Sequence, residues 1–361
     1  MQTLEYYLND LEDRINPDNE ETLEKAWLSF ADLKCNDQFF APFRQASSPR
    51  IEWPDVNIND AIQDNSLMIY SQLKMCSDML LNGSGELMCV RMNYGTGIIP
   101  TMLGAEVFMM PYEHNTLPGA RSLAHGIDDI RRIVSRGQWD YQIGLAGRVF
   151  STFDKYASVV ARYPKINRYI HVYNPDLQGP LALCELMWGS QFYLDLYDEP
   201  ELVSDTLKFF TDIYIGFTEK WHQAALTFDA GHSVEWGMLH RGATIIRNDA
   251  AMNISGDMYQ ELIAPHDQRI LNRFGGGVHF CGRGDHYIHV LATLNNLSVI
   301  NLSQPEYNDM EKIYQNTVDK NIIIIGLRSD EVRRAAESGR NLRGMVHSGA
   351  SMAAWLERDK R

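Results

Sequence analysis

The chain has 361 residues, of which 45% are hydrophobic, and this is enough to bury one large core. Asp and Glu number 47 against 33 for Lys and Arg, which gives a formal net charge of -14. Such a surplus of negative charge disfavours contact with nucleic-acid phosphates and with anionic membranes, so we expect neither partner.

The cysteine residues are scattered and odd in number, a pattern typical of reduced thiols rather than of a disulfide framework. The first nine residues are polar and acidic, unlike the basic and then apolar start of a secretory signal peptide. The longest aliphatic run, residues 322–325, is far too short to cross a bilayer. We therefore expect a cytoplasmic protein with free thiols at Cys35, Cys76, Cys89, Cys184 and Cys281.

Residues 1–85 show a helical pattern. Asn19 is predicted to cap a helix in which Leu23, Trp27 and Phe30 share one face. A second apolar stripe runs from Ile62 to Leu80 at helical spacing. These stripes are more typical of packing than of function, and they predict a helical N-terminal extension packed on a main domain that comprises residues 86–361.

After residue 85 the pattern changes to short β-like runs that end in turn residues, each followed by a helix-like stretch. Strand alternating with helix predicts a parallel sheet, and a count near eight favours a closed (β/α)8 TIM barrel over an open doubly wound sheet. The sequence lacks GxGxxG and GxxxxGK[ST], so neither a dinucleotide site nor a P-loop is indicated. The predicted strands are residues 87–93, 106–110, 168–174, 243–249, 277–281, 297–302, 322–327 and 343–347.

Polar side chains gather where these strands end, which is where the active sites of such barrels lie. One such ending would be an ordinary turn, but several together outline the rim of a pocket. The residues that we expect to bind a cofactor or substrate there are Asn93, Asn248, Arg283, Gln304 and Arg328.

His279 and Cys281 are the most informative pair on this rim. Residues i and i+2 of a strand face the same side, so an imidazole and a thiol are presented together. Zinc accepts both ligand types in tetrahedral sites, although two ligands are only half a site. The alternative is a buried cysteine beside a hydrogen-bonded histidine.

Two further residues are candidates for completing the site. His347 ends the last predicted strand and could serve as a third metal ligand, a proton donor or a substrate contact, or simply be a turn histidine. Asp249 could accept a hydrogen bond from a ligating histidine or bind a cationic group, or form an ordinary ion pair with Arg247. We assign catalytic roles to Asp249 and His347.

A glycine-rich stretch, GHSVEWGMLHRG, carries His232, Glu235, Trp236 and His240. It could fold over a pocket or form a surface turn, which is the commoner case for loops. The sequence has no GxSxG elbow, so hydrolysis by acyl transfer is not supported.

At these residues the sequence resembles the uroporphyrinogen decarboxylase superfamily, which includes cobalamin-dependent methyltransferases. The resemblance covers about residues 87–350 and rests on HVYNPDLQGPLALCELMWG, LYDEPELVSDTL, NDAAMNISGDMYQELIAPHDQRI, VHFCG and MVHSG. His279 and Cys281 match the His-x-Cys pair that binds zinc in the methyltransferases, while His347 stands where those enzymes carry a later cysteine. The RQAGR stretch of the decarboxylases reads VRMNYGTG here, so Arg91 matches the first arginine and the second is missing.

The resemblance therefore implies a zinc-dependent methyltransferase that moves a methyl group to or from a corrinoid protein or a small thiol or folate-type acceptor. Zinc would be held by His279, Cys281 and His347, and the corrinoid would be a co-substrate on a partner protein. One alternative is a decarboxylase of a tetrapyrrole or smaller acid, with carboxylates held by Arg91, Arg283 and Arg328. Another is a non-catalytic corrinoid-binding or ligand-binding subunit. The partners considered are a small-molecule substrate, a corrinoid protein and a second copy of the chain in a homodimer.

Overall fold

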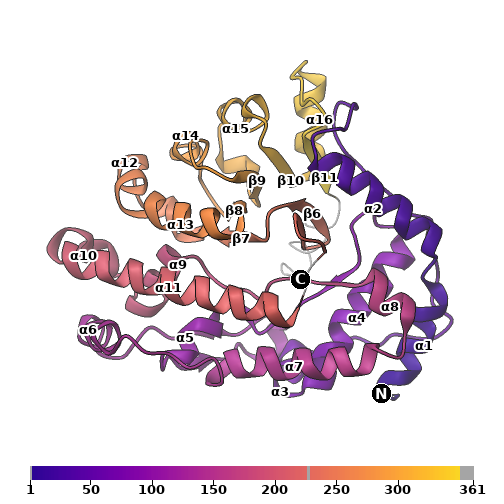
Figure 1. Ribbon diagram of the computed structural model, residues 1–361, viewed down its shortest axis with the longest axis horizontal. Coiled ribbons are helices and arrows are strands. Elements are labelled where there is room, and N and C mark those ends of the chain that lie inside the picture. The colour runs from indigo at the N-terminus through magenta and orange to yellow at the C-terminus, as the bar shows by residue number, and fades with distance from the viewer. Residues whose placement is uncertain (1, 226–227, 350–361) are drawn as a thin grey trace.

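The structure is a computed structural model that describes residues 2–225 and 228–349 (Figure 1). Its first part is helical, as predicted, and includes α1 (Leu4–Arg14), α2 (Pro17–Ala31), α3 (Ile58–Gln63) and α4 (Asn65–Asn82). The cap of α2 is Asn16 rather than the predicted Asn19: its side chain accepts hydrogen bonds from the backbone N–H groups of Asp18 and Asn19. Pro17 follows at the first helical position, where its missing N–H is not needed.

The main sheet has five parallel strands in the order β11-β10-β9-β8-β7. Their bounds are β7 (Thr244–Arg247), β8 (Gly276–Phe280), β9 (Leu297–Leu302), β10 (Ile323–Arg328) and β11 (Val346–Gly349). Single parallel bridges extend the sheet at both edges, from Phe40 to His347 and from Gln178 to Arg247. A separate parallel pair is formed by β1 (Cys89–Val90) and β4 (His171–Val172).

Seven of the predicted strands thus overlap parallel strands, and one does not. Within residues 106–110, β2 (Val107–Phe108) pairs antiparallel with β3 (Gly119–Ala120). Val107 and Phe108 are 37% and 40% exposed, so this run has no buried face with which to join a central sheet. Across residues 2–225 and 228–349 the hydrogen-bonded strands form four sheets, not the predicted closed eight-stranded barrel.

Helices lie mainly around the outside of the strands (Figure 1). The α-helices after α4 are α5 (Ile98–Met102), α6 (Ile127–Arg136), α7 (Gly144–Val160), α8 (Pro164–Tyr169), α9 (Pro180–Trp188), α10 (Phe192–Asp198), α11 (Pro200–Ala224), α12 (Gly256–Met258), α13 (Ala264–Phe274), α14 (Ile288–Leu291), α15 (Met310–Asn316) and α16 (Ser329–Glu337). A π-helical turn, η4 (Tyr259–Ile263), joins α12 to α13. Short 3₁₀ turns are η1 (Gly95–Gly97), η2 (Tyr112–His114), η3 (Asp249–Asn253), η5 (Pro305–Tyr307) and η6 (Val318–Lys320).

The glycine-rich stretch forms a β-hairpin of β5 (His232–Glu235) and β6 (Met238–Arg241). It packs against α2 and β9, and its tip is tied to the start of the first parallel pair, because the backbone N–H of Leu87 donates to the carbonyl of Gly237 at 2.7 Å. Glu235 and His240 are fully buried. The hairpin is therefore an interior element and not a surface turn.

Two glycines allow β8 to enter the sheet. A Cβ on Gly276, whose φ is +118°, would lie 1.9 Å from the carbonyl oxygen of Thr244, and one on Gly277 would lie 2.1 Å from that of Val299. No side chain fits at these distances, so the glycine run both ends α13 and lets β8 approach its neighbours closely. Within the described part of the chain, no helix has the length and apolar character needed to cross a membrane.

Candidate metal centre

His279 lies on β8 and is held by β9. Its Nδ1 is 2.5 Å from Oδ1 of Asn301, and Nδ2 of Asn301 donates to the carbonyl of Ile325 at 2.7 Å. Because the Asn301 nitrogen donates to Ile325, the atom of Asn301 that faces His279 is its oxygen. Nδ1 of His279 therefore donates to that oxygen. The other ring nitrogen, Nε2, is then the one available to a ligand.

Cys281 and Asp249 approach this nitrogen from the carboxyl ends of β8 and β7. The Cys281 Sγ atom lies 3.5 Å from Nε2 of His279, and Asp249 Oδ1 lies 3.4 Å from the same nitrogen. Asp249 also accepts a hydrogen bond from the backbone N–H of Cys281 at 2.8 Å. The ligand atoms of the three residues all lie within 4.8 Å of one another, which makes them a candidate metal site.

The three side chains interact strongly with one another. Burial alone would lower the pKa of His279, but the hydrogen bonds and charges of Asp249 and Cys281 outweigh it and raise this pKa to about 10. Burial works to raise the pKa of Asp249, yet the interactions with His279 and Cys281 lower it. The three side chains thus share protons at one place, and a divalent cation could displace those protons, since metal binding releases protons from its ligands.

Charged groups surround the triad on the β7 side. Arg247, 3% exposed, lies 3.0 Å from Oε2 of Glu235 and 3.3 Å from Asp176, which also contacts Arg91 at 3.3 Å. Burial raises the pKa of Glu235 to about 7, and this effect is larger than the lowering by the charge of Arg247 and the hydrogen bond from Asn174. Burial would also raise the pKa of Asp176, but the two guanidinium groups lower it.

The structure does not bring His347 into the triad. Its ring packs on Trp27 with 4.7 Å between ring centroids, and its Nδ1 accepts from the backbone N–H of Gly326 at 3.2 Å. Burial lowers the pKa of His347 to about 4, against a smaller opposing effect of Glu86. Among the described residues, the third potential ligand is Asp249, which the sequence suggested as a partner of a ligating histidine.

The residues predicted to bind a cofactor or substrate separate into two groups. Asn248 donates to Asp267 at 2.8 Å, and Gln304 accepts from the backbone N–H of Gly282 at 2.7 Å, so both support segments next to the triad. Arg283 and Arg328 instead form ion pairs away from the triad: Arg283 with the buried Asp285, and Arg328 with Glu306 and Asp330.

Asn93 belongs to neither group, because it is buried and its Oδ1 has no hydrogen-bond partner in residues 2–225 and 228–349.

Sequence reasoning did not single out Asn301, and it left open whether Trp236 lies near the site. Asn301 is a polar residue within the apolar strand LSVINL, and that break in the pattern was the available signal. Trp236, at the tip of the β5-β6 hairpin, lies with its ring centroid 5.3 Å from that of His279. Its position depends on a pairing within the glycine-rich stretch that the sequence left open.

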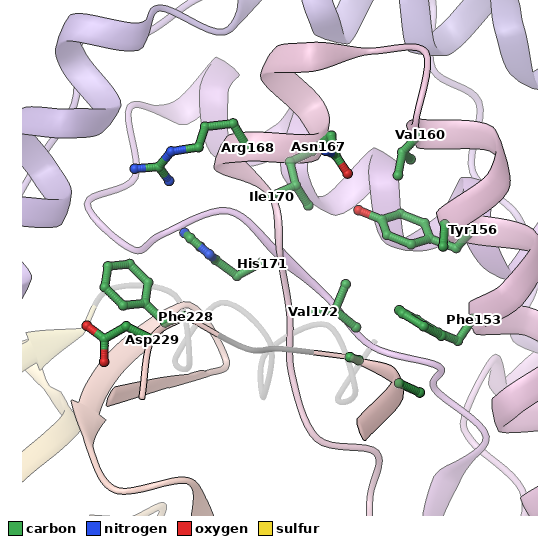
Figure 2. Close-up of a pocket in the computed structure, with 13 residues that line it drawn as sticks. Phe153, Tyr156, Val160, Asn167, Arg168, Ile170, His171, Val172, Phe228 and Asp229 are labelled. Atoms are coloured by element: carbon green, nitrogen blue, oxygen red, sulfur yellow. The ribbon is translucent and has the colours of Figure 1, made fainter. Parts of the chain in front are cut away.

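A cavity of about 550 Å³ opens at the amino end of β4, away from the triad. Figure 2 shows its mainly apolar lining, with Tyr156 and Phe153 on one wall and Phe228 and Asp229 on another. It includes none of the predicted site residues. The ligand chemistry, not the presence of a cavity, therefore identifies the candidate site.

Comparison with known proteins gives one informative result. No family model and no curated protein matches the chain. Among solved structures, it is similar to a methyltransferase from Methanosarcina mazei, with a TM-score of 0.60 and 12% sequence identity over 94% of this chain and 98% of that one. A likeness of this extent at so low an identity establishes a shared mixed α/β fold.

Proposed function

We propose that the protein is a methyl-transferring enzyme with a zinc site at Asp249, His279 and Cys281. One observation carries the proposal: three potential ligands converge at the carboxyl ends of the neighbouring parallel strands β7 and β8. Catalytic sites of barrel-like α/β folds lie at this end of the strands. The likeness of nearly the whole chain to a methyltransferase supports the same reaction class.

The donor set fits zinc. Thiolate, imidazole and carboxylate are its common ligands, and three protein ligands leave a fourth position for a substrate. The support of His279 fits as well, because Asn301 accepts a hydrogen bond from the ring nitrogen that would not bind the metal. Asp249 is 40% exposed at its side chain, so solvent and small molecules can reach the site. When bound, zinc supplies a positive charge that lowers the pKa of a nearby thiol.

The chain's own residues would then divide the work. Asn301 orients His279, and Asp249 holds the backbone of Cys281 in place by accepting a hydrogen bond from the Cys281 N–H. We propose a small thiol as the methyl acceptor and a corrinoid protein as the donor. In the same proposal, residues 86–361 are the catalytic domain and residues 1–85 are an extension packed on it.

The decarboxylase alternative receives no comparable support. It requires arginines that converge on a substrate, whereas Arg283 pairs with Asp285, Arg328 pairs with Asp330, and Arg91 is buried against Asp176.

The test is metal content together with methyl transfer. We expect the purified wild type to carry one zinc ion per chain, and Cys281→Ala and Asp249→Ala to lose it. The matched control, His347→Phe, should keep the metal, since His347 packs among aromatic rings outside the triad. Transfer is measured as loss of the methylcobalamin absorbance with a small thiol present. A metal-free protein that is fully active would overturn the proposal.

A further inference from the structure

The tip of the β5-β6 hairpin has an unfavourable residue for its backbone shape. Glu235 pairs with Met238, which leaves Trp236 and Gly237 as a two-residue turn. Their φ angles are +52° and +80°, as a type I′ turn requires at both positions. Asn, Asp and Gly suit the first of these positions, whereas a bulky side chain there is an outlier. Turn formation therefore does not explain the tryptophan.

The side chain of Trp236 lies between two groups of the site. Its ring is 5.3 Å from that of His279, at an interplanar angle of 51°, and the guanidinium carbon of Arg247 lies 5.0 Å from its centre. Arg247 is itself held by Glu235, the residue that precedes the tryptophan. The indole thus bridges the triad and the buried charges beside it.

The backbone beneath the indole has little freedom to move. Besides the hydrogen bond from Leu87 to the Gly237 carbonyl, a Cβ on Gly237 would lie 2.8 Å from both the Leu87 carbonyl oxygen and the Glu86 Cβ. The tip is therefore packed tightly against this segment. Backbone strain that persists in a fixed position is typical of functional sites.

The polar contacts of the His279 ring are all made by its two nitrogens. Nδ1 bonds to Asn301, and Nε2 lies 3.4 Å from Asp249 and 3.5 Å from Cys281. Trp236 adds an aromatic contact with the ring itself, at an interplanar angle of 51°. We infer that Trp236 is a positioning residue, whose indole holds the His279 ring so that Nε2 points at Cys281 and Asp249, and that the strained turn is kept for this purpose.

This inference concerns the site of the proposed function, and its first test is metal affinity. Trp236→Gly removes the indole and relieves the strain, and Trp236→Phe keeps an aromatic face. We expect Trp236→Gly to raise the zinc dissociation constant by about 10-fold to 100-fold, as loss of an outer-shell partner does, and Trp236→Phe to recover most of the affinity. Competition with a chromophoric chelator measures both constants.

Crystal structures of the metal-free proteins give the decisive readout, which a purely stabilising role for Trp236 would not change. In Trp236→Gly we expect the His279 ring to turn so that Nε2 moves away from Cys281 and Asp249. Trp236→Asn suits the turn and provides the same test if the glycine variant does not fold. A His279 ring that superposes on that of the wild type in these variants overturns the inference. If the wild type binds no zinc, the proposed function fails, while the crystal comparison still decides the role of Trp236.

Discussion

Replacing Asn301 tests whether the orientation of His279 matters for metal binding, because the histidine itself stays in place. The Asn301 carboxamide accepts from Nδ1 of His279 and donates to the carbonyl of Ile325. Asn301→Ala removes both bonds. Asn301→Asp keeps an acceptor for Nδ1 and loses only the donor, which makes it the matched control.

The two variants should differ in metal affinity and in stability. Each buried polar group left without a partner costs about 1–3 kcal/mol, so Asn301→Ala should lower the free energy of unfolding by about 2–6 kcal/mol, because both Nδ1 of His279 and the carbonyl of Ile325 lose this partner. Loss of the outer-shell acceptor should weaken zinc binding by about 10-fold to 100-fold, or about 1.4–2.7 kcal/mol. Asn301→Asp should keep zinc binding near the wild-type value, while the loss of the Ile325 contact and the burial of a carboxylate lower its stability.

Chelator competition at constant pH measures zinc binding, and urea unfolding of the metal-free protein measures stability. Wild-type zinc affinity in Asn301→Ala would refute the reasoning, because the ring would then be oriented without its acceptor. Equal loss of zinc in both variants would also refute it, since the aspartate retains the acceptor.

Three further predictions follow from buried groups and close backbone contacts. Burial lowers the pKa of the fully buried His240 to about 4. The same histidine takes up a proton near pH 6.5 in the unfolded chain, so stability should fall as the pH drops from about 6.5 to about 4. In His240→Gln, the stability measured by urea unfolding should depend less on pH over this range. Burial raises the pKa of Asp267 to about 7, against hydrogen bonds from Tyr259 and Asn248; the unfolded chain loses its proton near pH 4, so this group should make stability decline from about pH 4 to pH 7. Asp267→Asn should remove that decline, and a slope equal to that of the wild type would show that the carboxyl titrates normally. Gly277→Ala should prevent or strongly weaken folding, because its Cβ would meet the Val299 carbonyl at 2.1 Å; wild-type thermal stability of this variant would contradict the close approach of β8 and β9.

The order and position of the parallel strands were largely predictable from the sequence. Apolar runs bounded by turn residues located β7 to β11 to within a few residues, and β9 matches its prediction at both ends. The run at residues 106–110 failed because a short apolar stretch is equally compatible with an exposed hairpin.

Half of the candidate site could also be predicted. His279 and Cys281 are neighbours through the two-residue period of one strand, which is a local property. The partnership of Asp249 with them depends on the register between β7 and β8, and the exclusion of His347 depends on how β11 meets the aromatic rings of residues 27–40. Contacts between segments that are distant in the chain cannot be predicted from the periodicity of a single sequence.

The pairing of Phe40 with β11 has a consequence for how the protein is made. The backbone N–H of Phe40 donates to the carbonyl of Val346, and that of Ser348 donates to the carbonyl of Phe40, so the two partners are separated by almost the whole chain. A ribosome releases residue 40 long before it releases residue 346, and contacts between such distant segments form slowly. Until residue 346 has been synthesised, the segment around Phe40 lacks this backbone partner. This edge of the main sheet therefore forms only after both segments have been synthesised.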